Sequence, residues 1–145
     1  MKYLLDLNAL IALGDPNHVH HNAIQNWFIA EGHKNWGVCP LTEAGFIRIT
    51  ANPRFCAVPR TVDLAIAILQ SYAGHPGYCY WPIMEMDKWA LLTAPFAARI
   101  VGHQQVTDAY LLGLAIKYEG VLVSFDKALL HLAGPEYLKN LRVLE

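Results

Sequence analysis

Few cysteines, few charges and no long hydrophobic run set the first limits on what this 145-residue chain can be. Its three cysteines, Cys39, Cys56 and Cys79, are odd in number and lack C-x-x-C spacing, which argues against a disulfide framework and a structural zinc site. Polar residues or glycines interrupt every apolar run before the ~20 residues that a membrane-spanning helix needs. The amino-terminal stretch has no signal-peptide cleavage site, so we expect a cytoplasmic protein without membrane association.

The net charge is only −1, so bulk charge does not attract this chain to nucleic acid. A nucleic-acid partner would have to be met by a local basic patch or by a bound metal ion. What the sequence does have is apolar content, with 54% hydrophobic against 16% charged residues, which is typical of a well-packed core. Because no repeat or linker divides the chain, we expect a single domain over residues 1–145.

Short apolar stretches alternate with helical patterns along the whole sequence. The spacing of apolar residues, and the Gly and Pro residues between the segments, predict helices over residues 8–13, 18–31, 41–49, 61–74, 85–92 and 103–119. One more short helix is expected before the last strand. The expected strands cover residues 2–6, 36–39, 78–81, 121–124 and 141–144. This alternation predicts an α/β domain with a mainly parallel sheet.

Four acidic residues fall where such a sheet brings distant segments together. Asp6 ends the first expected strand, Asp126 follows the fourth, and Glu43 lies in the first helical turn after the second. Asp108 lies near the start of the long helix before the fourth strand. The helix from Asp108 to Gly120 is about 18 Å long, and the extended segment from Gly120 to Asp126 returns about 20 Å in the opposite direction. All four acids should therefore reach the edge of the sheet where open α/β folds bind their ligands.

Carboxylates that converge beside an apolar core either raise one another's pKa or recruit a cation. Oxygen ligands without suitably spaced His or Cys suit a hard ion, Mg²⁺ or Mn²⁺, which can activate water for phosphodiester hydrolysis. Each acid also has a structural interpretation. Asp6 and Asp126 could cap the helices that follow them. Glu43 could complete a capping box or stabilise a helix dipole, and a helix dipole is also available to Asp108.

The segments "LLDLNALIAL", "LTEAGFIRI", "VTDAYLLGLA" and "LVSFDKAL", in this order and at this spacing, resemble a PIN domain. The most similar kind is the VapC toxin of bacterial toxin–antitoxin pairs, and the resemblance covers nearly the whole chain. It implies a five-stranded parallel sheet of order 3-2-1-4-5 with helices on both faces. It also implies a Mg²⁺- or Mn²⁺-dependent endoribonuclease that forms a homodimer, cleaves tRNA or rRNA, and is inhibited by a VapB-type antitoxin.

By matching position, the resemblance implies that the acidic metal-binding quartet is Asp6, Glu43, Asp108 and Asp126. Asn8 occupies a small polar position after the first acid, and Ser124 occupies a position where a small hydroxyl residue often precedes the last acid. Leu7 departs from the Thr or Ser that is frequent there, although the carboxylate before it is retained. Thr107, beside Asp108, and Arg48, on the helix of Glu43, are supporting candidates.

Other residues have weaker claims to a functional role. Arg54 and Arg60 flank a loop and could pair with phosphates, or they could belong to an ordinary solvated surface. The cluster of His18, His20 and His21 is interpreted as a solvated helix start rather than a metal site.

Two other functions compete with the metal-dependent ribonuclease toxin. A haloacid-dehalogenase-type phosphatase also places an Asp after its first strand, but it needs a second Asp where this chain has Asn8. A catalytically silent PIN-fold binding module is the other alternative, and four intact acids argue against it.

Overall fold

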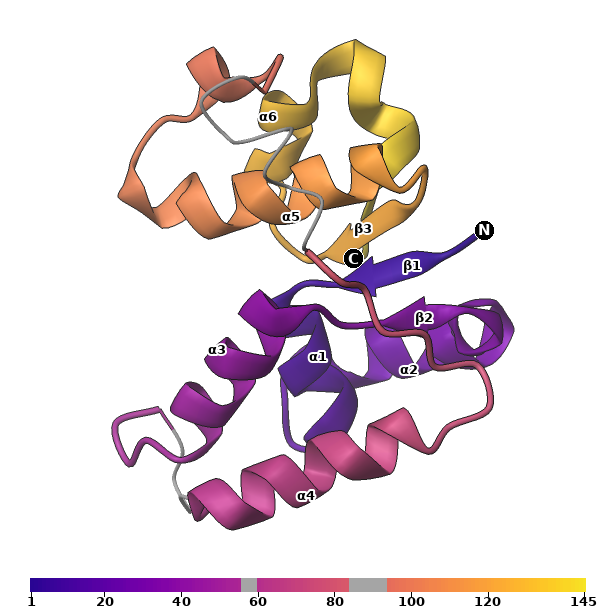
Figure 1. Ribbon diagram of the computed structural model, residues 1–145, viewed down its shortest axis with the longest axis vertical. Coiled ribbons are helices and arrows are strands. Elements are labelled where there is room, and N and C mark those ends of the chain that lie inside the picture. Colours follow the sequence, from indigo (N-terminus) through magenta and orange to yellow (C-terminus); the bar gives the residue numbers. More distant parts are fainter. Residues whose placement is uncertain (56–59, 84–93) are drawn as a thin grey trace.

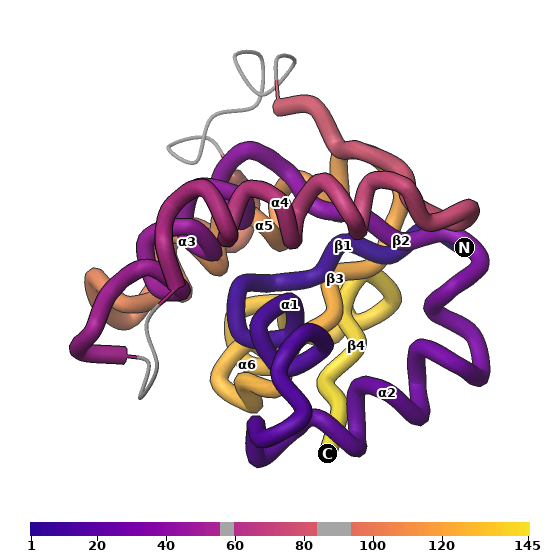
Figure 2. Tube along the Cα trace, turned by 90° about the horizontal axis from the view of Figure 1, so that it is seen from below, coloured from indigo at the N-terminus to yellow at the C-terminus, as the bar shows by residue number. Residues whose placement is uncertain are grey.

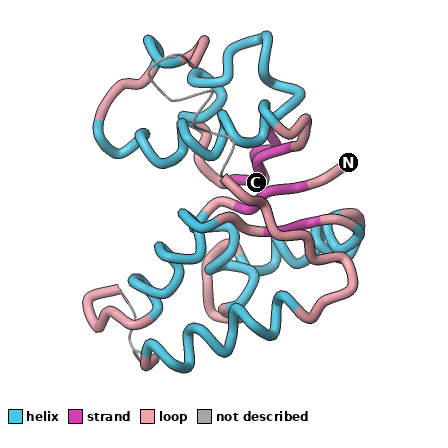
Figure 3. The backbone as a smooth tube through the Cα atoms, in the orientation of Figure 1, coloured by secondary structure: helices cyan, strands magenta, loops and turns pink. Residues whose placement is uncertain are grey.

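A four-stranded parallel sheet lies at the centre of the molecule, between two groups of helices (Figures 1 and 3). The computed structural model describes residues 1–55, 60–83 and 94–145. The strands are β1 (Tyr3–Leu5), β2 (Trp36–Gly37), β3 (Val121–Ser124) and β4 (Leu141–Val143), in the spatial order β2-β1-β3-β4. No helix in the described part of the chain is long and apolar enough to cross a membrane.

The central strands are apolar on both faces, as parallel strands covered by helices must be. Leu4 pairs with Gly37 on one side and with Leu122 on the other. Leu4, Leu5, Leu122 and Val123 are all fully buried. The first strand thus runs through the middle of the core, and its carboxyl end leads directly to Asp6.

Two helical layers cover the sheet. The amino-terminal layer consists of α1 (Leu7–Gly14), α2 (His21–Ala30), α3 (Pro40–Thr50) and α4 (Val62–Ala73). The other layer contains α5 (Val106–Lys117) and α6 (Ala128–Tyr137). Each layer packs its own hydrophobic cluster against one face of the sheet, and α3 and α4 pack against each other at the outside of their layer (Figure 2).

The predicted helix boundaries are largely confirmed. Thr61 caps α4, because its side chain accepts a hydrogen bond from the backbone N–H of Leu64 at 3.1 Å. The helix expected over residues 103–119 is divided into a short 3-10 turn, His103–Gln105, and the α-helix α5. The helix expected over residues 85–92 lies outside the described residues.

Residues 78–81, expected to form the edge strand of a five-stranded sheet, do not form a strand. The predicted five-stranded sheet is wrong in this respect. Tyr78 forms one isolated parallel bridge with Trp36, and two further backbone hydrogen bonds join Cys79 N to Trp36 O and Trp81 N to Val38 O. The segment therefore lies at the expected edge of the sheet. The ladder cannot extend because β2 has only two residues before the chain turns into α3 at Pro40.

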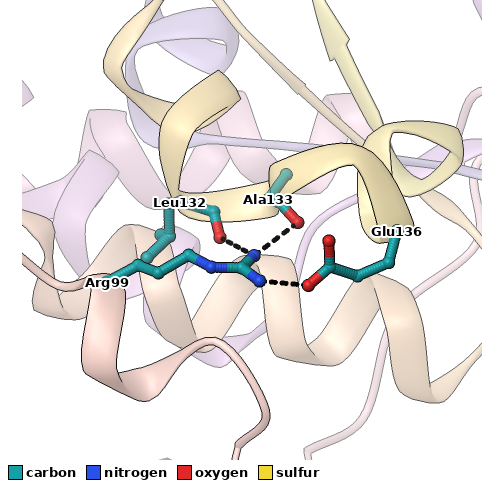
Figure 4. A network of polar contacts seen from close by, with 4 residues as sticks. All are labelled: Arg99, Leu132, Ala133 and Glu136. Atoms are coloured by element: carbon teal, nitrogen blue, oxygen red, sulfur yellow. Dashed lines mark hydrogen bonds and ion pairs between the residues drawn. The ribbon is translucent and has the colours of Figure 1, made fainter.

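Arg99 fastens the segment before α5 to α6 (Figure 4). It ends the 3-10 turn Ala97–Arg99, and its Nη1 donates to the carbonyl oxygens of Leu132 (3.3 Å) and Ala133 (3.0 Å). These carbonyls lose their helical partners because α6 kinks at Gly134, whose φ is +63°, just before Pro135. An ion pair between Arg99 and Glu136 completes the contact. Arg99 thus acts as a cap for the first part of α6.

Candidate functional site

Asp6 is a buried carboxylate at the carboxyl end of β1, with only 4% of its surface exposed. Its Oδ1 accepts the backbone N–H of Ala9 at 2.8 Å, so the structural interpretation of Asp6 as the N-cap of α1 is confirmed. Burial raises the pKa of Asp6 to about 6, and the Asp126 charge adds to this rise, while hydrogen bonds from Ser124 and Ala9 oppose it. Capping alone does not explain why an acid occupies so costly a position.

Asp108 lies in the first turn of α5 and is half-buried. Its pKa is raised to about 7, chiefly by burial and then by the charges of Asp6 and Asp126. The structure therefore brings these three aspartates, from three separate segments, within electrostatic reach of one another. Among the described residues no salt bridge joins any of the three to a cationic side chain, and such a group of like charges attracts a cation.

Asp126 follows β3, and hydrogen bonds fix its position. Its Oδ1 accepts the N–H of Ala128 at 2.9 Å, and its own N–H donates to Ser124 Oγ at 3.0 Å. Ser124 is fully buried, and its hydroxyl also bonds the Asp6 carboxylate. Ser124 therefore ties the first aspartate to the backbone of the third.

Glu43 is half-buried in the first turn of α3, but it faces a different neighbourhood. Burial and then the Glu43 charge raise the pKa of Tyr78 to about 12, and they also raise the pKa of Tyr80, which hydrogen-bonds Glu43. Glu43 is not among the causes that shift the pKa of Asp6 or Asp108. The structure thus groups three of the four acids and places the fourth beside the tyrosines.

Thr42, and not Glu43, forms the capping box of α3. Its Oγ1 accepts the backbone N–H of Cys39 at 3.0 Å, and Pro40 occupies the start of the helix. This finding removes the capping-box interpretation of Glu43 and leaves the helix dipole as its structural alternative.

Two of the supporting candidates are chain neighbours of the aspartates, whereas the third lies in the last turn of α3. Asn8 is exposed on α1 two residues after Asp6, and Thr107 is exposed beside Asp108. Arg48 is exposed in the last turn of α3, one turn beyond Glu43. None of these three side chains has a hydrogen bond with the aspartates among the contacts of the described residues.

The histidine cluster has structural roles that its spacing did not reveal. His20 stacks on Phe125, and the two ring centroids are 4.2 Å apart. Phe125 is the residue between Ser124 and Asp126 in the chain. His21 Nδ1 lies 2.7 Å from Ala12 O, and His18 Nδ1 accepts the N–H of His20. The sequence held no signal for the stacking, because it joins residues more than a hundred positions apart.

The donor set of the three aspartates fits a hard cation by its chemistry, since it offers oxygen ligands only. The side chains are not arranged around an ion, however. Within residues 1–55, 60–83 and 94–145, no group of three or more His, Cys, Asp or Glu side chains is placed to hold a metal. Binding an ion would require the carboxylates to approach one another.

Comparison with known proteins identifies the family. No family model matches the chain. It is 43% identical to Ribonuclease VapC39 of Mycobacterium tuberculosis over 131 residues, which cover 89% of this chain and 91% of that protein. It is 38% identical to Ribonuclease VapC38 over 135 residues (90% and 89%) and 32% identical to Ribonuclease VapC44 over 147 residues (97% and 96%), both of the same organism. The resemblance drawn from the sequence motifs is confirmed, and this chain belongs to the VapC family of PIN-domain toxins.

Proposed function

We propose that this protein is a metal-dependent endoribonuclease, the toxin of a VapBC-type toxin–antitoxin pair. The observation that carries the proposal is the convergence of Asp6, Asp108 and Asp126, because burial and then the charges of Asp6 and Asp126 raise the pKa of Asp108. Relatives that share at least 32% identity across nearly the whole chain bear the name ribonuclease, which supports the same activity here.

Asp6, Asp108 and Asp126 would hold Mg²⁺ or Mn²⁺, with Glu43 as a fourth acid reaching in from α3. When bound, the ion would supply positive charge at the phosphodiester and lower the pKa of a water molecule. The protein's own contribution is orientation. Ser124 and the Ala9 N–H hold the Asp6 carboxylate, and the Ala128 N–H holds that of Asp126.

Glu43 has a distinct part in this proposal. Its contact with Tyr80 keeps the carboxylate at the margin of the site, where it can orient the attacking water or the ion.

The test is cleavage of total RNA by purified protein in the presence of Mg²⁺ or Mn²⁺. Asp6→Asn and Asp108→Asn should each lower the rate at least about 100-fold, because each removes a charged ligand. Asp6→Asn retains an oxygen that can cap α1, so loss of activity would not reflect loss of the helix. Asp63→Asn, an exposed acid in the first turn of α4, is the matched control and should cleave normally.

Metal-independent cleavage, or equal cleavage by the aspartate variants and the control, would refute a metal-dependent nuclease at the three aspartates. Absence of any RNA cleavage by the wild-type protein would refute the nuclease proposal and favour the silent binding module instead.

The toxin role makes a separate demand. We propose a cytoplasmic homodimer that binds a cognate VapB-type antitoxin and attacks tRNA or rRNA. Expression of the chain alone should arrest bacterial growth, and co-expression of the antitoxin should restore it. Growth unaffected by a protein that cleaves RNA in vitro would separate the nuclease from the toxin.

A further inference from the structure

A groove runs along α1 and α3 and reaches the first turn of α1, which begins directly after Asp6. It has a volume of about 590 Å³, within the range of ~300–1,000 Å³ that is usual for ligand sites. At the end nearest the acids it is lined by Asn8, two residues after Asp6, and by Phe46, one helical turn after Glu43. At the other end it is lined by Phe55 and Arg60. One end of the groove therefore lies within two residues of Asp6 along the chain.

The cations around this groove are unpaired. Of the five arginines, Arg99 and Arg142 form ion pairs with glutamates. Arg48, Arg54 and Arg60 form no ion pair with a carboxylate in the portions of the chain that the structure describes. All three belong to α3 or to the connection between α3 and α4, and Arg60 lines the groove itself.

Aromatic and polar groups complete the groove. Phe55 is 67% exposed, which is unusual for so large an apolar side chain and leaves its ring available for stacking. His18 lines the groove, and because its Nδ1 accepts the N–H of His20, its Nε2 carries the remaining proton as a donor. Asp15 also lines the groove, and its negative charge would repel an anion. Its Oδ1 accepts a hydrogen bond from the N–H of Asn17.

We propose that this groove binds an unpaired nucleotide of the RNA beside the cleaved bond, with its phosphate at Arg60 and its base against Phe55. The inference rests on the proposed ribonuclease function. A strand that passes three aspartates needs cations on either side to offset their repulsion, and Arg60 supplies one. Stacking on Phe55 requires a base whose face is free, so the groove selects single-stranded RNA over a duplex.

The experiment measures RNA binding separately from cleavage. The Asp108→Asn protein is titrated in Mg²⁺ buffer against a fluorescein-labelled, unstructured RNA of about ten nucleotides, and binding is followed by anisotropy. Adding Arg60→Gln should weaken binding about 5- to 10-fold and reduce the salt dependence by the equivalent of one phosphate contact, a slope of about 0.7. Arg60→Lys should restore most of both.

Phe55→Ser should weaken binding about 5- to 10-fold with no change of salt slope, because stacking is not electrostatic. Lys139→Gln is the matched charge control, since Lys139 is exposed on the short helix before β4 at the opposite edge of the sheet, and it should bind normally. The different salt signatures of the two groove variants distinguish a nucleotide site from general loss of structure.

Unchanged RNA binding by Arg60→Gln and Phe55→Ser would overturn the groove assignment. If the same variants instead lost inhibition by the antitoxin, the groove would be a protein-docking surface, and the inference would again be wrong. Cleavage by the protein with Asp108 intact is assayed in parallel. If the protein with Asp108 intact cleaves RNA but the groove variants bind RNA normally, only the groove assignment is refuted. If the protein neither cleaves nor binds RNA, the proposed function is refuted.

Discussion

Asp108 is under electrostatic stress that a neutral isostere would remove. Its pKa is raised to about 7 from an ordinary value of 3.8, so ionisation at neutral pH opposes folding. We predict that Asp108→Asn stabilises the metal-free protein at pH 8 by about 1–3 kcal/mol, after allowance for partial exposure of the side chain. The measurement is urea unfolding in EDTA.

The gain should shrink as the pH falls from 7 towards 4, because the folded wild-type carboxyl is then protonated and already neutral. Asp63→Asn on the exposed first turn of α4 serves as the control, with a change of no more than about 0.5 kcal/mol. A destabilised Asp108→Asn protein at pH 8 would show that Asp108 has a stabilising partner that this structure does not reveal.

The sequence indicated the convergence of the aspartates but not the surroundings of Glu43. Strand and helix lengths alone predict that Asp108 and Asp126 return to one edge, and the structure brings both near Asp6. The direction of Glu43 depends on its contact with Tyr80, in a segment whose pairing with the sheet is irregular. Such a contact has no local sequence signal, because it depends on how two loops meet. The metal-binding roles of all four acids stay predictions.

Elements with a periodic apolar pattern were predictable, whereas short edge pairing was not. The helix α4 begins after Thr61 as expected, since both its cap and its apolar spacing are local. The segment at residues 78–81 has the composition of a strand, with Tyr78, Tyr80 and Trp81. Whether it pairs depends on its neighbour, and β2 is only two residues long. Pairing of this kind is a tertiary property that overrides local β-propensity.

Glu31 joins three elements at the sheet edge away from the aspartates. It lies at the end of α2, and its Oε1 accepts hydrogen bonds from Trp27 Nε1 (2.9 Å), Tyr3 OH (3.2 Å) and Arg142 Nη1 (3.1 Å). We predict that Glu31→Ala lowers the free energy of unfolding by about 1–3 kcal/mol, chiefly because the buried Trp27 N–H loses its acceptor.

The matched variant Glu31→Gln keeps an acceptor oxygen and loses only the charge. It should cost less than about 1 kcal/mol, since the ion pair with Arg142 is largely exposed to solvent. Urea denaturation of both variants measures the difference. Equal losses for Gln and Ala would mean that the charge, and not the hydrogen bond to Trp27, stabilises this junction.

Asp6 and Asp108, at the edge of the sheet, are buried or half-buried, so their ionisation makes the stability of the whole fold depend on pH. Burial raises the pKa of Asp6 to about 6, and that of Asp108 is about 7. Both pKa values exceed those of the unfolded chain. The free energy of unfolding is therefore highest below pH 4 and falls as the pH rises to 7, because the two folded carboxyls must then ionise. A cation bound only by the folded state would reverse the loss.

We therefore predict that Mg²⁺ raises the melting temperature at pH 8 and has little effect at pH 5, where the carboxyls of Asp6 and Asp108 are protonated and neither attract nor ligate the ion well. At a Mg²⁺ concentration of 100 times the dissociation constant, the stabilisation should be about 2.7 kcal/mol. Differential scanning calorimetry with and without Mg²⁺, at matched ionic strength, measures it. The Asp108→Asn protein should show no such shift at either pH. An equal Mg²⁺ effect in that variant, or an effect that does not grow between pH 5 and pH 8, would place the ion elsewhere than at the three aspartates.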